Sequence, residues 1–96
     1  MSYELEFLED ALKEWSRLDA SVRRVFKRKL EERLQNPKVP SAKLRTMKDC
    51  YKIKLHDVGY RLIYQVSDNK VVVTVIAVGR RDKGAVYQAA QDRLDD

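Results

Sequence analysis

Three cationic side chains, Lys52, Lys54 and Arg61, fall on one face of a predicted β-hairpin that spans residues 51–66. Apolar and polar residues alternate on both sides of a four-residue loop at 56–59, and this register places Lys54 directly opposite Arg61. Like charges in that position destabilise a pair of strands, yet this face carries no acidic residue to offset them. Such a cluster is suited to binding a phosphate, because arginine offers paired donors and lysine a compact charge.

A second group of polar residues follows the last predicted strand, in the segment 79–87. Arg80, Arg81 and Lys83 emerge just after that strand, about one helical turn before Tyr87. We expect the hairpin cations and Arg81 to line one solvent-facing pocket, with Tyr87 beside it. A phenol in that position could stack on a base, hold a hydroxyl group or give up its proton.

These residues also have simpler interpretations. Lys54 and Arg61 could merely protect an exposed sheet edge, and Tyr87 could be an ordinary half-buried helix residue. We expect His56 to be an exposed loop residue without a catalytic role, because the sequence places no acid to orient it. Cys50 is expected to be a small, semi-buried side chain and not a nucleophile.

The sequence excludes several standard sites. One histidine and one cysteine cannot supply a zinc site at the usual ligand spacing. There is also no glycine-rich phosphate loop and no readable Ser/His/Asp constellation. We therefore expect no metal and no cofactor.

Composition indicates one soluble globular domain over residues 1–96, with 44% hydrophobic and 36% charged residues. No apolar run approaches the roughly 18 residues that a membrane span needs, and the acidic start is unlike a signal peptide. A cytoplasmic location without membrane contact is the expectation. The formal charge of +5 favours a polyanionic partner, either nucleic acid or an acidic protein.

Periodicity predicts an α+β fold: a strand, two helices, antiparallel strands and a terminal helix. The expected elements begin with a strand at 3–7, a helix at 8–18 and a second helix from Asp19 or Ser21 to 35. A mostly irregular segment follows at 38–49, with a possible strand edge at 42–45. After the hairpin come a central strand at 70–78 with two apolar faces and a last helix capped by Asp82. The second helix has a basic face, which we interpret as solvated and not as a nucleic-acid surface. Its residues are Arg23, Arg24, Lys27, Arg28 and Arg33.

The whole chain resembles the RelE family, the toxins of RelBE toxin–antitoxin pairs. The resemblance rests on ALKEW at 11–15, KLR at 43–45, DCYKIKL at 49–55, GYRLIYQV at 59–66, KVVVTVIAVGRR at 70–81 and VY at 86–87. It implies a microbial-ribonuclease-like fold, with an antiparallel sheet, two N-terminal helices and one C-terminal helix. It also implies an endoribonuclease that cleaves messenger RNA in the ribosomal A site without the histidine and glutamate usual in such enzymes.

The resemblance assigns a role to each candidate residue. Lys52 and Lys54 match lysines that contact the substrate and transfer protons, while Arg61 and Arg81 match arginines that hold the scissile phosphate. Tyr87 matches a tyrosine that stacks on or orients the cleaved nucleotide. Further RNA contacts are expected from Lys43, Arg45, Arg80 and Lys83.

The implied reaction is attack of a ribose 2′-hydroxyl on its own 3′-phosphate, which leaves a cyclic phosphate and a free 5′-hydroxyl. Arginine cannot act as the base at ordinary pH, so either neutral Lys54 or Tyr87 removes the proton. Cations suit this reaction because its transition state carries extra negative charge.

The resemblance also implies partners: a RelB-like antitoxin, the ribosome with its 16S rRNA, and mRNA. Operator DNA would be bound only through the antitoxin complex, when toxin and antitoxin together repress their own operon. Two alternatives from other classes stay open. The chain could be a basic module that binds RNA or the ribosome without chemistry, or a domain whose basic faces accept an acidic protein.

Overall fold

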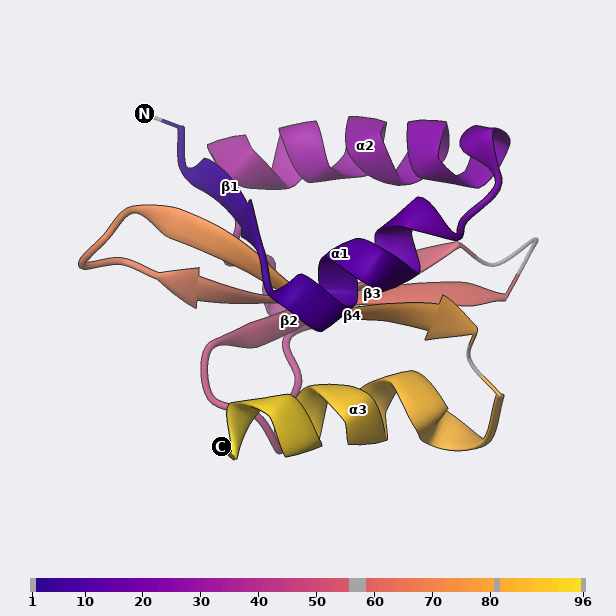
Figure 1. Ribbon diagram of the computed structural model, residues 1–96. Helices are drawn as coiled ribbons and strands as arrows, with labels where there is room; N and C mark the ends of the chain where they lie inside the picture. The colour runs from indigo at the N-terminus through magenta and orange to yellow at the C-terminus, as the bar shows by residue number, and fades with distance from the viewer. Residues whose placement is uncertain (1, 56–58, 81, 96) are drawn as a thin grey trace.

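The structure is a computed structural model that describes residues 2–55, 59–80 and 82–95, without the side chain of Lys83. A four-stranded sheet with strand order β1-β4-β3-β2 lies between two helical layers (Figure 1). Helices α1 and α2 cover one face, and α3 covers the other. The elements are β1 (Glu4–Phe7), α1 (Glu9–Ser16), α2 (Ala20–Gln35), η1 (Pro40–Ala42), β2 (Cys50–Leu55), β3 (Tyr60–Ser67), β4 (Val72–Arg80), η2 (Asp82–Gly84) and α3 (Ala85–Leu94). The predicted α+β class is confirmed.

Strands β2 and β3 form the predicted hairpin in the predicted register. Leu55 pairs with Tyr60 and Lys54 with Arg61. The N–H of Gly59 donates to the carbonyl of Leu55 at 2.9 Å, so the ladder closes immediately beside the loop. The other loop residues, 56–58, lie outside the described residues, and the expectation for His56 lies there with them.

Strand β4 is the central strand that its two apolar faces predict. It pairs antiparallel with β3 and parallel with β1, so the sheet is mixed and not wholly antiparallel. The parallel pair is possible because α1, α2 and the hairpin separate the two strands in the chain, which gives room for a crossover. Its pairing with β3 shifts between Ile63 and Tyr64, where Ile76 is the extra residue of a β-bulge.

The bulge decides which side chains of β4 face which helical layer. Val75 and Val78 pack in the core under α1 and α2. Ile76 and Ala77 both pack toward α3, in a smaller core that includes Val86. Two consecutive residues therefore share a face, and the alternation restarts after them.

The last helix begins differently from the prediction. Asp82 does not cap it, because Asp82–Gly84 form a 3-10 turn and α3 starts three residues later. Gly84 occupies the N-cap position with φ 69°, a left-handed conformation that glycine adopts without steric cost. Helix α2 follows Asp19 as predicted and ends at Gln35, before the Asn36–Pro37 break. None of the helices within the described ranges is long and apolar enough to cross a membrane.

Tyr64 links the end of α2 to the hairpin. Its side chain is fully buried, its hydroxyl donates to the carbonyl of Pro37 at 2.7 Å, and Arg33 donates to that hydroxyl at 2.9 Å. Arg33 also donates to the carbonyl of Lys52 at 3.2 Å. Arg33 is therefore half-buried against β2, contrary to its assignment to a solvated face, because its long side chain reaches over the edge of the helix.

Replacing Tyr64 by phenylalanine should destabilise the fold by about 1–3 kcal/mol. The change leaves the buried Pro37 carbonyl without its donor and removes the acceptor of Arg33, while the packing volume is nearly kept. Urea unfolding followed by circular dichroism measures the difference. The matched control is Tyr3→Phe, which removes an exposed hydroxyl that donates to Asp68, and its loss of stability should be clearly smaller. Equal losses for both variants would contradict this account.

Candidate functional site

The structure brings Lys52, Lys54 and Arg61 together on the sheet face that α3 covers. Lys54 and Arg61 are directly paired, and Lys52 pairs with Ile63, which packs in the core under α3. Both lysines are half-buried. Arg61 is only 7% exposed, so the expectation of a solvent-facing arginine is wrong.

Arg61 is buried beside a glycine of β4. Its partner in the ladder is Gly79, which adds no side chain next to it. A Cβ built at Gly79 would lie 3.8 Å from the Cβ of Val86, an ordinary van der Waals contact, so α3 packs directly over this glycine. Arg61 thus lies between Lys54 on β2 and Gly79, which has no side chain, on β4.

The charge of this cluster is unbalanced within the described part of the chain. Arg61 donates one hydrogen bond there, to the carbonyl of Tyr60 at 3.0 Å. No carboxylate among the described residues forms a salt bridge with Lys52, Lys54 or Arg61. Such a set of donors without an acid is electrostatically prepared for an anion such as a phosphate.

Helix α3 adds Tyr87 to the same face of the sheet. Val86 and Ala90 are the buried residues of the helix, and Tyr87 is half-buried against the same small core. Half-burial is compatible with both interpretations of Tyr87 that the sequence left open. The helix thus brings a phenol to the sheet face that carries the hairpin cations.

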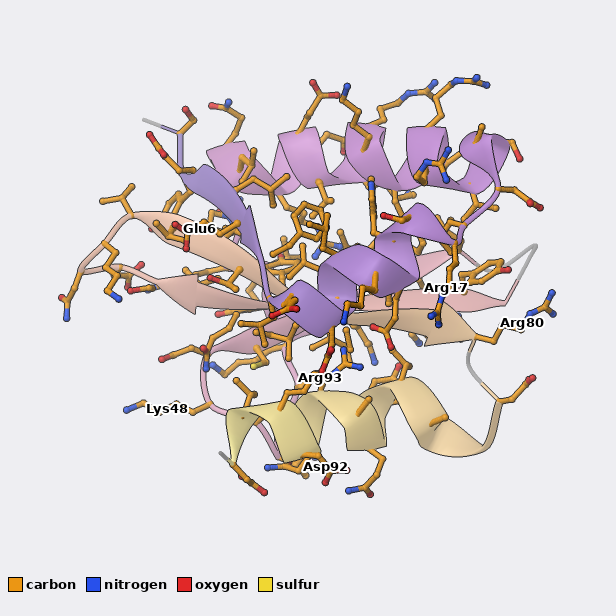
Figure 2. All side chains as sticks on the ribbon, in the orientation of Figure 1. Glu6, Arg17, Lys48, Arg80, Asp92 and Arg93 are labelled. Atoms are coloured by element: carbon orange, nitrogen blue, oxygen red, sulfur yellow. The ribbon has the colours of Figure 1, made fainter. Side chains whose placement is uncertain are left out.

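Two of the predicted RNA-binding residues lie elsewhere. Arg80 pairs with Tyr60, and its guanidinium carbon lies 5.3 Å from the centre of that ring, on the α1 and α2 side (Figure 2). Lys43 is placed similarly, with its Nζ 5.3 Å from the ring centre of Tyr51. Both cations stack on aromatic rings of the other face, so the structure does not bring them to the cluster.

The other predicted site residues are less constrained. Arg45 is exposed in the turn that precedes β2. Arg81 lies outside the described residues, and so does the side chain of Lys83. Their assignments therefore remain predictions from the sequence.

Cys50 is a structural residue. It is fully buried beneath α3, and its thiol donates to the carbonyl of Lys48 at 3.4 Å. Burial raises the pKa of the thiol to about 11, so it stays protonated at neutral pH. This environment agrees with the expected structural role of Cys50, which is buried more deeply than expected.

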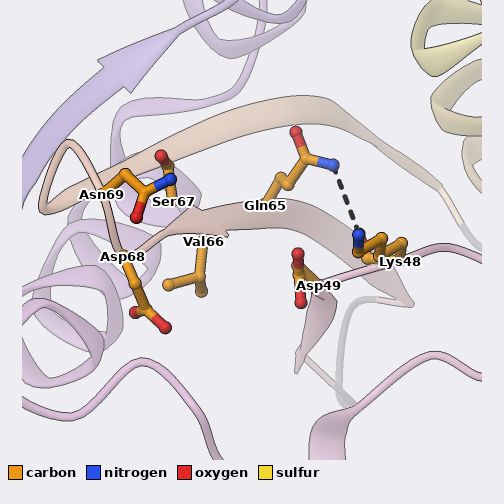
Figure 3. Close-up of a pocket in the computed structure, with 7 residues that line it drawn as sticks. All are labelled: Lys48, Asp49, Gln65, Val66, Ser67, Asp68 and Asn69. Atoms are coloured by element: carbon orange, nitrogen blue, oxygen red, sulfur yellow. Dashed lines mark hydrogen bonds between the residues drawn. The ribbon is translucent and has the colours of Figure 1, made fainter.

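A hollow near the hairpin does not coincide with this site. A pocket of about 340 Å³ lies at the far end of β3 (Figure 3), and its wall is Lys48, Asp49, Gln65, Val66, Ser67, Asp68 and Asn69. Gln65 donates to the carbonyl of Lys48 across it at 3.2 Å. None of the predicted site residues lines this pocket, and its charges are mixed. We therefore assign the site to the cationic sheet face.

One polar cluster was not foreseen from the sequence. Glu14 of α1 and Arg93 of α3 form a two-fold hydrogen-bonded ion pair, with contacts of 2.8 and 2.9 Å. The two residues are 79 positions apart, and no local spacing signals such a pair. Only the three-dimensional fold brings them together.

The fold is a sheet covered by α1 and α2 on one face and by α3 on the other, and the α3 face is cationic. These features define a small basic protein suited to a phosphate-bearing partner. The comparisons with known proteins place it further. The chain belongs to the ParE toxin family of type II toxin–antitoxin systems, whose family model, the ParE toxin of parDE, matches residues 5–84. It is also similar to the mRNA interferase toxin RelE of Escherichia coli strain K12, with 54% identity over 94 residues, 98% of this chain and 99% of RelE.

Solved structures agree with this placement. A free E. coli RelE variant with two arginines changed to alanine matches with a TM-score of 0.91 and 53% identity, over 98% of this chain and 99% of that one. The toxin in the intact E. coli RelBE toxin–antitoxin complex matches with a TM-score of 0.83 and 55% identity, over 85% of this chain and all of that one. The resemblance to RelE seen in the sequence is confirmed.

Proposed function

We propose that this protein is a ribosome-dependent endoribonuclease that cuts messenger RNA in the ribosomal A site and so stops translation. The observation that carries the proposal is the buried Arg61 paired with Lys54, beside Lys52, without an acid among the described residues that would neutralise them. The similarity to a protein named mRNA interferase toxin supports it. A cationic face of this kind matches the charge that a cleaved phosphate develops.

The proposed chemistry is an internal transfer of the phosphate. The 2′-oxygen forms a bond to phosphorus as the bond to the 5′-oxygen breaks, which leaves a 2′,3′-cyclic phosphate and a 5′-hydroxyl. The 2′-hydroxyl proton passes to the neutral amine of Lys54 or to the phenolate of Tyr87, and the leaving 5′-oxygen takes a proton from the ammonium of Lys52 or from water. Arg61, with Arg81 as its predicted companion, stabilises the charge on the phosphate oxygens.

We further propose that a RelB-like antitoxin silences this toxin and represses the shared operon together with it. The net charge of +5 suits an acidic partner, and the related E. coli toxin is solved in the RelBE complex. Saturating cognate antitoxin should abolish cleavage on ribosomes. Unchanged cleavage under those conditions would refute this part of the proposal.

The test of the enzyme proposal is to map 5′ ends on cellular mRNA after brief expression of the chain. New 5′-hydroxyl ends should appear within translated regions, and purified protein should cut mRNA on ribosomes but leave free mRNA nearly intact. A module that only binds RNA or ribosomes would arrest translation without new ends. Equal cutting of free mRNA would refute the dependence on the ribosome.

Substitutions at Tyr87 should separate its two proposed roles. If the ring only stacks on a base, Tyr87→Phe should keep most of the activity while Tyr87→Ala loses about 10-fold or more, as expected for about 1–3 kcal/mol of lost stacking. If the phenol carries a proton, both variants should fail. Tyr87 is half-buried at the edge of the small core, so Phe should keep the fold. Single-turnover cleavage on programmed ribosomes gives the rates, and full activity of Tyr87→Ala would exclude both roles.

A further inference from the structure

The last part of β4 has no neighbouring strand on one side. Pairing with β1 ends at Phe7 and Val75, and the N–H of Leu8 makes the final bond, to the carbonyl of Val75 at 3.0 Å. From Ile76 to Arg80, β4 continues without a strand on that side within the described residues. The backbone groups on such an open edge need other partners when they are shielded from water.

Glu14 and Arg93 supply these partners. Arg93 donates to the carbonyl of Ile76 at 2.8 Å, and the Oε1 of Glu14 accepts from the N–H of Val78 at 3.1 Å. The two side chains bond each other at 2.8 and 2.9 Å, and Asp10 lies 4.0 Å from the Nε of Arg93. The pair therefore gives β4 a donor for the Ile76 carbonyl and an acceptor for the Val78 N–H. One residue of a neighbouring parallel strand would supply the same two groups.

The pair also connects three elements around this edge. Glu14 comes from α1 on one face of the sheet, and Arg93, which is labelled in Figure 2, comes from α3 on the other. Both side chains bond the backbone of β4 between them. The side chains of Glu14 and Arg93 are 28% and 20% exposed, so solvent weakens the pair less than it weakens an exposed one. The ladder between β3 and β4 is also locally disrupted here, because Ile76 is the bulge residue.

We propose that Glu14 and Arg93 are positioning residues for RNA cleavage, which replace the missing strand at the end of β4 and hold α3 against it. Gly79, which faces Arg61, follows Val78 directly, and Tyr87 precedes Arg93 by about two turns of α3. The pair thus fixes the cationic hairpin and the phenol relative to each other. This inference rests on the proposed function.

The test is single-turnover cleavage on programmed ribosomes over a range of ribosome concentrations. Arg93→Ala and Glu14→Ala should lower the maximal rate by about 10- to 100-fold, because a displacement of about 1 Å in reacting groups costs that much. The half-saturating ribosome concentration should stay unchanged, since neither residue belongs to the cationic face. The matched control is Lys13→Ala, which removes an exposed ion pair with Glu9 on the same helix and should keep the parent rate.

Exchanging the charges of Glu14 and Arg93 distinguishes two roles of the pair. The pair could act through its hydrogen bonds to β4, or only through the attraction between α1 and α3. Glu14→Arg combined with Arg93→Glu restores opposite charges, but it turns an acceptor toward the Ile76 carbonyl and a donor toward the Val78 N–H. We expect this double variant to stay as slow as the single ones. Recovery of the parent rate would overturn the inference, because attraction between α1 and α3 would then suffice.

Hydrogen exchange gives a readout that does not depend on activity. The Val78 amide should exchange faster in Glu14→Ala than in the parent chain, while amides between β2 and β3 keep their protection. If alanine at position 93 prevents folding, Arg93→Lys keeps one donor for the Ile76 carbonyl and should give an intermediate rate. If the Val78 amide of Glu14→Ala exchanges faster but the maximal cleavage rate is undiminished, this inference is wrong while the proposed function stands. If the parent chain itself does not cleave mRNA on ribosomes, both the proposed function and this inference are wrong.

Discussion

A ribosome-bound mRNA that carries hydrogen in place of the 2′-hydroxyl at the cleaved nucleotide should not be cut at all. In the proposed reaction this hydroxyl is the nucleophile, and neither Lys54 nor Tyr87 can act as a base on an absent proton. Single-turnover assays with parent and 2′-deoxy messages measure the difference. The parent protein is active in the same experiment, so an unfolded or inhibited sample cannot imitate the result.

The matched control for that substrate is a 2′-deoxy substitution at the next nucleotide on the 3′ side. It removes a hydroxyl from the same message but leaves the nucleophile in place, so cutting should proceed at nearly the parent rate. Undiminished cutting of the first substrate would show that water or a protein group attacks the phosphate. The basic face would then serve a hydrolysis with different products.

Lys54→Ala should slow single-turnover cleavage by a factor on the order of 10² or more, as expected for a lost proton-transfer group or transition-state donor. The fold should be retained, because Lys54 is half-buried and its removal relieves repulsion with the paired Arg61. Arg81→Ala is expected to show a similar loss. Thermal unfolding together with the cleavage rate separates lost chemistry from lost structure.

The control for Lys54 is Lys70→Ala, which removes an equal charge from the exposed turn between β3 and β4. It should cleave like the parent. Arg61→Ala is a less informative variant, because Arg61 is only 7% exposed and its removal leaves a hole beneath α3. A fully active Lys54→Ala would remove the cationic hairpin from the catalytic site.

The hairpin could be predicted from the sequence because everything that fixes its register is local. Alternation and loop length place Lys54 opposite Arg61, and the structure has this pair. The burial of Arg61 could not be predicted, because it depends on a third strand, β4, whose Gly79 faces it, and on the α3 layer that covers this face of the sheet. Burial of this kind is a property of three segments that are distant in sequence.

The position of Arg80 shows a second limit of sequence reasoning. Simple alternation from Val73 and Val75 would place residue 80 on the face that carries Lys54 and Arg61. The bulge at Ile76 shifts the alternation by one residue, and Arg80 instead stacks on Tyr60 on the opposite face. The apolar run of β4 contains no marker for this bulge, because residues on both of its faces are hydrophobic.

The same bulge makes β4 sensitive to insertions but not to the loss of the bulge residue itself. Deletion of Ile76 would restore simple alternation, and each later residue would keep its partner on β3 and its face, so Gly79 would still face Arg61. Insertion of one residue between Ala77 and Gly79 would instead move every later side chain to the other face. Gly79 would then no longer face Arg61, and Arg80 would turn toward the cluster that it now avoids. Homologous genes should therefore tolerate loss of the bulge residue more readily than an insertion between the bulge and Gly79.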